Sequence, residues 1–188
     1  MDEQLGARSW LLASGLLLAA CTPAPVPIPQ PSPSHSAPPS SAMSQRVGQR
    51  DCASRVHVGF DDAAWRAAPS AGPAAFAPLD YTWGDPGVFA TRTPDDQGWR
   101  RFKVAMRLQS GTPATLTIPA VHRDVAALTY LNGLDHTIAF SACGETSDPV
   151  NSEFAGGFAL REAVCLPLEL NWNGGTDRVV LDFGKGQC

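Results

Sequence analysis

Cysteine is the residue type whose chemistry this sequence indicates most directly. Four cysteines in the C-terminal part of the chain form an even set, as expected for an exported protein with two disulfides: Cys52, Cys143, Cys165 and Cys188. In residues 137–143 and 164–170, alternating apolar residues place Cys143 and Cys165 on the polar side of their strands, so we expect these two to pair. An intervening strand, or a bulge at Pro167, would prevent that pairing. We expect the second bridge to join Cys52 to Cys188, near the two ends of the domain.

The fifth cysteine, Cys21, follows an apolar run over residues 9–20. This run is shorter than the roughly 20 residues that span a bilayer, but it suits a signal peptide. Its Leu-Ala-Ala-Cys end, residues 18–21, resembles the lipobox of bacterial lipoproteins, which implies that residues 1–20 are removed and that Cys21 carries lipid. Asp2 and Glu3 depart from the positive start of export signals. Plain secretion with an unmodified Cys21 and an uncleaved anchor therefore remain alternatives.

The next segment, residues 21–45, is a linker rich in proline and serine. Eight of the 21 residues from 22 to 42 are proline and five are serine. Such a composition cannot bury apolar surface, and at about 3.1 Å per residue it predicts an extended spacer of at most about 65 Å. We expect it to hold a single domain, residues 46–188, away from the membrane. A proline-rich ligand for a recognition domain is the alternative.

Alternating apolar residues in the domain predict strands rather than helices. We expect an all-β fold, an antiparallel β-sandwich of about eight strands that is Ig-like or jelly-roll-like and held by disulfides. The expected strands cover residues 55–60, 101–108, 116–118, 125–131, 137–143, 154–161, 164–170 and 178–183. Asn132-Gly133 and Asn173-Gly174-Gly175 are signals for tight turns. Residues 61–68 are expected to form a short helical turn within a long loop over 61–98.

Histidine and carboxylate residues offer little evidence of catalysis. The sequence lacks the HExxH, GxSxG, P-loop and dinucleotide motifs, so its catalytic residues are unknown and we expect no cofactor. His57 falls on a polar strand face, and His122 and His136 fall near strand ends or turns. An exported hydrolase using His122 or His136 with the neighbouring Asp124 or Asp135 is one alternative to a binding role. A small-ligand or metal-binding protein is another.

Two specific metal sites are disfavoured by the residue pattern, and we expect none. A blue-copper site needs two histidines and usually a weak methionine beside its cysteine, but neither residue occurs just after Cys143. Residues 144–153 are rich in oxygen ligands, but their spacing is not that of an EF-hand. The sequence favours a solvated loop there.

Tryptophan residues are the candidates for contact with a ligand. Trp83 lies in the YTWGDPG segment and Trp172 lies beside an expected hairpin turn. Tryptophan can hold a sugar or a protein partner, although packing in the core is its commoner role. We therefore take Trp83 and Trp172 as candidate ligand-binding residues.

The C-terminal part of the chain resembles a group of small exported actinobacterial proteins of uncharacterised function. The resemblance covers residues 116–188 and rests on an Ala-Cys pair at a strand end, the FAGGF and CLPLEL segments, and a cysteine near the C-terminus. It implies export and a β-rich domain, and it transfers no activity and no catalytic residues.

These observations together predict an extracytoplasmic protein, for which a binding or structural role is favoured over an enzymatic one. The formal net charge is −4 and lysine is scarce, with no basic run, so a nucleic-acid partner is not expected. We expect a β-domain anchored to the cell membrane through lipid, with a binding or structural role at the envelope and an envelope protein or a glycan as partner.

Overall fold

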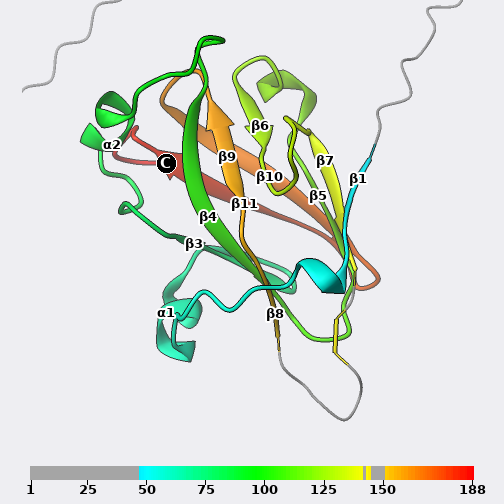
Figure 1. The fold of residues 1–188 in the computed structure, drawn as a ribbon. Helices are drawn as coiled ribbons and strands as arrows, with labels where there is room; N and C mark the ends of the chain where they lie inside the picture. Colours follow the sequence, from blue (N-terminus) through cyan, green and yellow to red (C-terminus); the bar gives the residue numbers. More distant parts are fainter. Residues whose placement is uncertain (1–46, 142, 145–150) are drawn as a thin grey trace, which may run out of the picture. The chain divides into compact units, whose positions relative to one another are not determined.

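The alternating strands form two β-sheets that face each other. The computed structural model describes residues 47–141, 143–144 and 151–188. The first sheet, here the β10 sheet, contains strands in the order β1 (Gly48–Arg50), β7 (Thr137–Phe140), β5 (Ala114–Thr117), β10 (Val164–Trp172) and β11 (Gly175–Phe183). The pairs are antiparallel except for β1 and β7, which are parallel (Figure 1).

The second sheet, here the β4 sheet, is built around the long strand β4. Its order is β2 (Ser70–Ala71), β3 (Ala74–Pro78), β4 (Arg100–Leu108), β9 (Gly157–Leu160) and β6 (Ala126–Leu128), and β8 (Ser152–Phe154) also pairs with β4. Short helices occur in the connections: η1 (Cys52–Ser54), α1 (Asp62–Ala67), α2 (Gly87–Thr91) and η2 (Ala120–His122). The all-β sandwich predicted from the sequence is confirmed.

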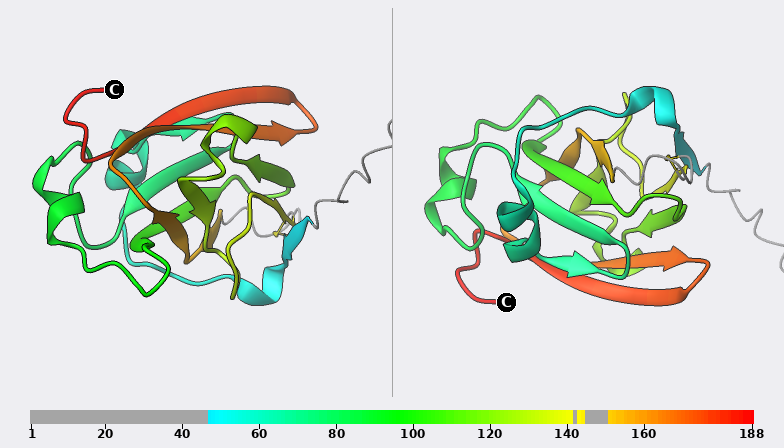
Figure 2. Two further views of the ribbon diagram at one scale, coloured as in Figure 1. Left: turned by 90° about the horizontal axis from the view of Figure 1, so that it is seen from above. Right: turned by 90° about the horizontal axis from the view of Figure 1, so that it is seen from below.

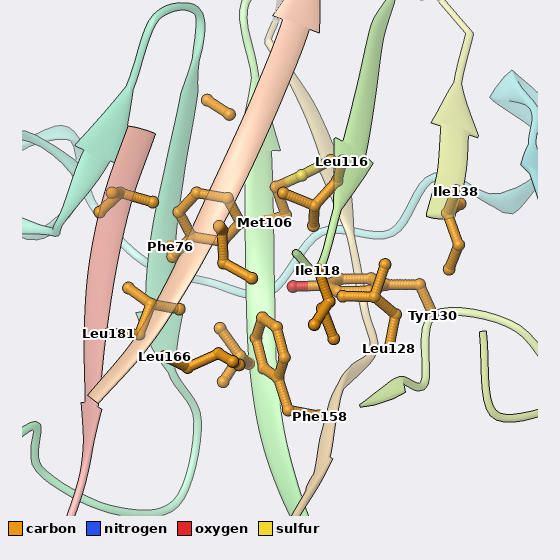
Figure 3. Close-up of a cluster of buried hydrophobic side chains, with 14 of the residues drawn as sticks. Phe76, Met106, Leu116, Ile118, Leu128, Tyr130, Ile138, Phe158, Leu166 and Leu181 are labelled. Carbon is orange, nitrogen blue, oxygen red and sulfur yellow. The ribbon is translucent and has the colours of Figure 1, made fainter. Parts of the chain in front are cut away.

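The core lies between the sheets because each contributes one apolar face. Phe76, Met106 and Phe158 enter from the β4 sheet and meet residues such as Leu116 and Leu166 of the β10 sheet (Figure 3). All of these side chains are fully buried. A cluster of aromatic rings fills one part of the core, with Phe183 within 5.2 Å of the ring centroids of both Phe102 and Phe158. Burial of this kind is the main stabilising contribution to such a fold.

The two sheets differ in how their outer faces are covered. On the β4 sheet, Trp65 of α1 packs over the small residues Ala77 and Ala105, and α1 lies beside β3 (Figure 2). Trp99 similarly covers alanines of β6 and β9. On the β10 sheet, the outer face is mainly polar, although the exposed Val180 also lies on it. Its polar residues are half-exposed or exposed: Thr115, Thr117, Glu169, Asn171, Thr176 and Arg178.

Most predicted strands are present, with three corrections. The expected strand over 55–60 is wrong, because only Val56 makes a bridge, to Glu153. The expected strand over 154–161 is two strands, β8 and β9, separated at Ala155 and Gly156. The long loop over 61–98 contains α1, β2, β3 and α2. The helical turn within it and the tight turn at Asn173-Gly174 are confirmed.

Both predicted disulfide pairings are wrong. The first observed bridge joins Cys52 to Cys143, with a Cα–Cα distance of 5.4 Å. Strand β7 ends at Phe140, so strand alternation does not extend to Cys143, which is buried rather than solvent-facing. Because β1 runs parallel to β7 with Arg50 beside Phe140, the residues just beyond each strand lie together. The parallel pair therefore places Cys52 next to Cys143.

The second observed bridge joins Cys165 to Cys188, with a Cα–Cα distance of 5.6 Å. Cys165 does lie on the half-exposed side of β10, as its alternation predicts. Its strand neighbour is Asp182 of β11, so the chain that follows β11 begins beside it. Gly184 and Gly186 have φ values of 85° and 86°, a conformation that favours glycine and turns the chain back toward β10.

Candidate functional site

Glu153 is the buried carboxylate that lines a pocket beside α1 and β8. The residue is 7% exposed, and one carboxylate oxygen accepts a hydrogen bond from the Val58 backbone N–H at 2.8 Å. The other oxygen accepts one from Trp65 Nε1 at 3.0 Å, and the Glu153 backbone carbonyl accepts from the Val56 N–H. This carboxylate thus fastens the segment after η1, and helix α1, to strand β8. The burial of an ionised group is offset by these donors.

The pocket beside Glu153 has a volume of about 600 Å³ and carries charges of both signs. Its ionisable lining residues are Arg55, His57, Asp61, Asp62, Arg107 and Glu153. Asp62 forms an ion pair with Arg107 at 2.8 Å, and Asp61 caps α1 by accepting from the Ala64 N–H. His57 Nδ1 lies 3.6 Å from Glu153, and its side chain is 85% exposed. Most of the charge in this pocket is therefore committed to holding the fold.

The lining of this pocket does not match a hydrolytic centre built on a side-chain hydroxyl, thiol or lysine amine. Its lining contains no serine, threonine, cysteine, tyrosine or lysine that could act as a nucleophile beside His57. The Glu153 carboxylate accepts hydrogen bonds from Val58 and Trp65 and also lies 3.6 Å from His57 Nδ1, so it joins two segments of the fold beside an exposed imidazole. Across the residues that the structure describes, no group of three potential metal ligands comes together.

The histidines favoured by the hydrolase alternative are not brought into such a pocket. His122 lies in η2 and His136 precedes β7, where its backbone carbonyl accepts from the Ile118 N–H. Within the described ranges, the carboxylate found within ion-pair distance of a histidine belongs to Glu153, beside His57. The sequence-based choice of His122 and His136 with Asp124 and Asp135 thus finds no support in the ion pairs of the fold.

The prediction of a solvated loop over residues 144–153 is wrong for its last residues, Asn151 and Glu153. Glu153 is a buried strand residue, and Asn151 is half-buried. The other acidic residues of that segment, Glu145 and Asp148, lie outside the described residues. Sequence reasoning missed Glu153 because its buried partners, Val58 and Trp65, are 95 and 88 positions away.

Trp83 belongs to the edge of the core. Its ring makes edge contacts with Tyr81 and Phe183 at centroid distances of 5.3 and 5.4 Å, and its indole N–H is buried without a hydrogen-bond partner. A shallow apolar hollow of about 330 Å³ is lined by Trp83, Tyr81 and Phe60 among others. Burial raises the pKa of the Tyr81 hydroxyl, which keeps this ring neutral. Trp83 is therefore mainly a packing residue.

Trp172 lies at the end of β10 and borders a second hollow, of about 310 Å³. The other residues that line it are Pro113, Ala114, Thr115, Ala139, Phe140, Asn171 and Asn173. Strand neighbours β7, β5 and β10 supply most of these side chains, and the small Ala139 leaves room between them. In this hollow, here the Trp172 hollow, Thr115, Ala139 and Asn171 belong to the outer face of the β10 sheet. Ala114, Phe140 and Trp172 belong to the core-facing row, and Trp172 packs partly against the core.

The remaining predicted site residues are the cysteines. Cys52, Cys143, Cys165 and Cys188 are all in disulfides, which indicates an oxidising, extracytoplasmic compartment. Cys21 lies outside the described residues. The part of the chain that the structure covers contains no helix long and apolar enough to cross a membrane.

The fold is a disulfide-held β-sandwich. No family model, curated protein or solved structure matches the chain.

Proposed function

We propose that this chain is a lipid-anchored, extracytoplasmic binding protein of the bacterial envelope. Two disulfides support export, and the Leu-Ala-Ala-Cys segment at 18–21 supports lipid attachment at Cys21. The proline- and serine-rich residues 22–42 support a spacer between that anchor and the domain. The proposal includes membership of a group of small exported actinobacterial proteins.

The observation that carries a binding role is the contrast between the two outer sheet faces. The β4 sheet is covered by Trp65 and Trp99, whereas the β10 sheet leaves a polar face with the Trp172 hollow open to solvent. In the part of the domain that the structure describes, no other element covers this face, so it is available to a partner. A hydrolase is less well supported, because the pocket beside His57 has no serine, threonine, cysteine, tyrosine or lysine among the described residues of its lining.

The anchor is tested with the Cys21→Ala variant expressed in a bacterial host. The parent chain should fractionate with membranes and carry the added mass of lipid at residue 21, whereas the variant should be released or retained as an unprocessed precursor. The measurement is cell fractionation combined with mass spectrometry of the N-terminal peptide. Identical distribution of the two proteins, with no lipid mass on the parent, would refute the anchor.

The binding role is tested by co-sedimentation with isolated cell envelopes. The whole chain, carrying Cys21→Ser so that lipid cannot contribute, should sediment with the envelope fraction. Ala139→Lys should prevent this by filling the Trp172 hollow. Val180→Lys is the matched control, because Val180 is 47% exposed on edge strand β11 and the change adds the same charge. Equal sedimentation of the two variants would place the binding surface elsewhere.

A further inference from the structure

The lining of the Trp172 hollow contains no ionisable side chain. Its polar groups are the hydroxyl of Thr115 and the side-chain amides of Asn171 and Asn173, and its aromatic group is the indole of Trp172. Hydroxyls and amides both donate and accept hydrogen bonds without carrying charge. The indole packs partly against the core, and its exposed part adds apolar surface at the edge of the hollow. Such a set matches a ligand that presents many hydroxyls and no net charge.

Two of these groups are held in place by the fold. Thr176 Oγ1 donates a hydrogen bond to Asn171 Oδ1, so the N–H groups of the Asn171 amide are left to act as donors. The Trp172 indole lies between Gly72 and Gly174, and a β-carbon at either glycine would collide with the ring. Among the residues described, no acceptor is bonded to Trp172 Nε1, and this atom is not among the fully buried unpaired polar atoms. A side chain fixed in this way loses little conformational entropy when a ligand binds.

The polar surface continues beyond the hollow along the sheet. Strand register aligns Ala139, Thr115, Asn171 and Thr176 in one row across four strands. A second row aligns Thr137, Thr117, Glu169 and Arg178, and its two charges form an ion pair at 2.6 Å that leaves the row neutral overall. Adjacent strands lie about 4.8 Å apart, so four strands present roughly 14 Å of aligned hydroxyl and amide groups. This length suits a chain-like ligand rather than one small molecule.

We propose that the Trp172 hollow and the adjoining threonine rows bind a neutral sugar chain of the envelope. This inference rests on the proposed binding function and names its ligand class. The alternative partner, an envelope protein, is the other outcome of the test below.

The decisive experiment treats the envelope fraction before co-sedimentation with the whole Cys21→Ser chain. Periodate, which cleaves the vicinal diols of sugars, should reduce the bound protein about tenfold or more, corresponding to about 1.4 kcal/mol or more of binding free energy. Protease treatment of the envelope alone should leave binding in place. Because the hollow has no ionisable side chain and the Glu169–Arg178 pair in the adjoining row is neutral overall, binding should also persist at about 0.5 M salt, where exposed charges are screened.

The outcomes separate the two proposals. Binding that survives periodate but is lost after protease treatment would overturn the sugar proposal and leave the binding function standing. If the protein bound none of the envelope fractions, both the binding function and the sugar proposal would be overturned. Loss of binding in Asn171→Ala together with retention in Val180→Lys would support the site. Periodate-sensitive binding that Asn171→Ala and Ala139→Lys leave unchanged would overturn the assignment of the hollow.

A defined probe sharpens the ligand class. In native gels containing a neutral polysaccharide such as dextran, mannan or galactan, the parent should migrate more slowly in at least one, and Ala139→Lys should not. Retardation only in gels containing the anionic polygalacturonate would contradict a neutral ligand. Circular dichroism of each variant at the assay temperature confirms that the fold is intact.

Discussion

Glu153 joins segments that are distant in sequence. Its carboxylate accepts from a backbone N–H of the segment before α1 and from the indole of α1, while its own strand pairs with β4. Glutamine has the same length but only one side-chain oxygen, so it would not match both donors as the carboxylate does. Glu153 therefore illustrates a buried charge whose hydrogen-bond partners are all supplied by the fold.

We predict that Glu153→Gln lowers the free energy of unfolding by about 1–3 kcal/mol, the cost of a buried donor left unpaired. The glutamine oxygen can accept from one of Val58 and Trp65, while its amide nitrogen faces the other donor. Urea denaturation followed by circular dichroism measures the loss. The control is Glu162→Gln, an exposed position that should change stability by less than about 0.5 kcal/mol. Equal stability of the two variants would show that the carboxylate is not required.

Asp177 provides a pH-dependent contact between the sheets. Backbone N–H groups of Gly72 and Arg178 donate to its carboxylate and lower its pKa. A carboxyl whose folded pKa lies below its unfolded value of about 3.9 stabilises the fold above that value and loses the contribution as pH falls through the folded pKa.

We therefore expect Asp177→Asn to reduce the acid sensitivity of the fold. The difference in melting temperature between about pH 6 and about pH 3 should be smaller for the variant than for the parent. Melting curves at several pH values in one ionic strength measure this difference. Parallel pH profiles for the two proteins would contradict the assigned role of Asp177.

At the scale of elements, the break between β8 and β9 lets one segment pair twice with β4. Gly157 starts β9 with a φ of 153°, and a β-carbon there would collide with the backbone oxygen of Phe102 in β4. The two strands can follow β4 closely because residue 157 has no side chain. A glycine at this position is thus required by close approach of two backbones.

Gly157→Ala should destabilise the fold much more than Gly175→Ala. Both glycines have positive φ, so each substitution costs about 1–3 kcal/mol in backbone strain. A β-carbon at Gly175 would point into open space, whereas at Gly157 overpacking adds about 1–3 kcal/mol or more. Chemical denaturation, or soluble yield where Gly157→Ala fails to fold, measures the difference. Similar losses would indicate that β4 can shift to accept the methyl group.

The sequence predicted elements well where apolar alternation is long. Strands β4, β10 and β11 alternate over much of their lengths, and their buried residues follow from that pattern. Strand β1 was missed, because Gly48–Arg50 is short and carries no apolar alternation. The Cys52–Cys143 pairing was therefore not predicted, because it depends on the parallel register of β1 with β7. Trp172 was identified as a candidate from its position beside a hairpin turn. The hollow beside it could not be predicted, because its lining comes from three strands, β5, β7 and β10, whose pairing is not visible in the sequence.

At the scale of the whole molecule, the disulfides close loops of very different length. The Cys52–Cys143 bridge spans 91 residues and the Cys165–Cys188 bridge spans 23. In the chain-entropy model these closures contribute about 4.6 and about 3.4 kcal/mol, respectively. The longer loop includes most of the β4 sheet, so this bridge restricts the unfolded chain more.

We predict that Cys52→Ala/Cys143→Ala loses more stability than Cys165→Ala/Cys188→Ala. Each double variant keeps the other bridge and leaves no unpaired thiol in the domain, so the comparison isolates loop closure. Peptide mapping without reduction establishes the pairing, and guanidinium denaturation gives the two losses. A mapped Cys143–Cys165 bridge, or a greater loss from the C-terminal pair, would contradict this order.

The parallel pairing of β1 with β7 and the adjacent Cys52–Cys143 bridge also determine how the domain responds to mechanical load. A pull applied from the N-terminal side first acts on β1, whose hydrogen bonds to β7 are loaded together in shear. If β1 detaches, extension stops at Cys52, because the covalent bond to Cys143 transfers the force directly into the middle of the chain. Only the few residues before Cys52 would be released, and the β10 sheet beyond β7 would keep its shape under tension.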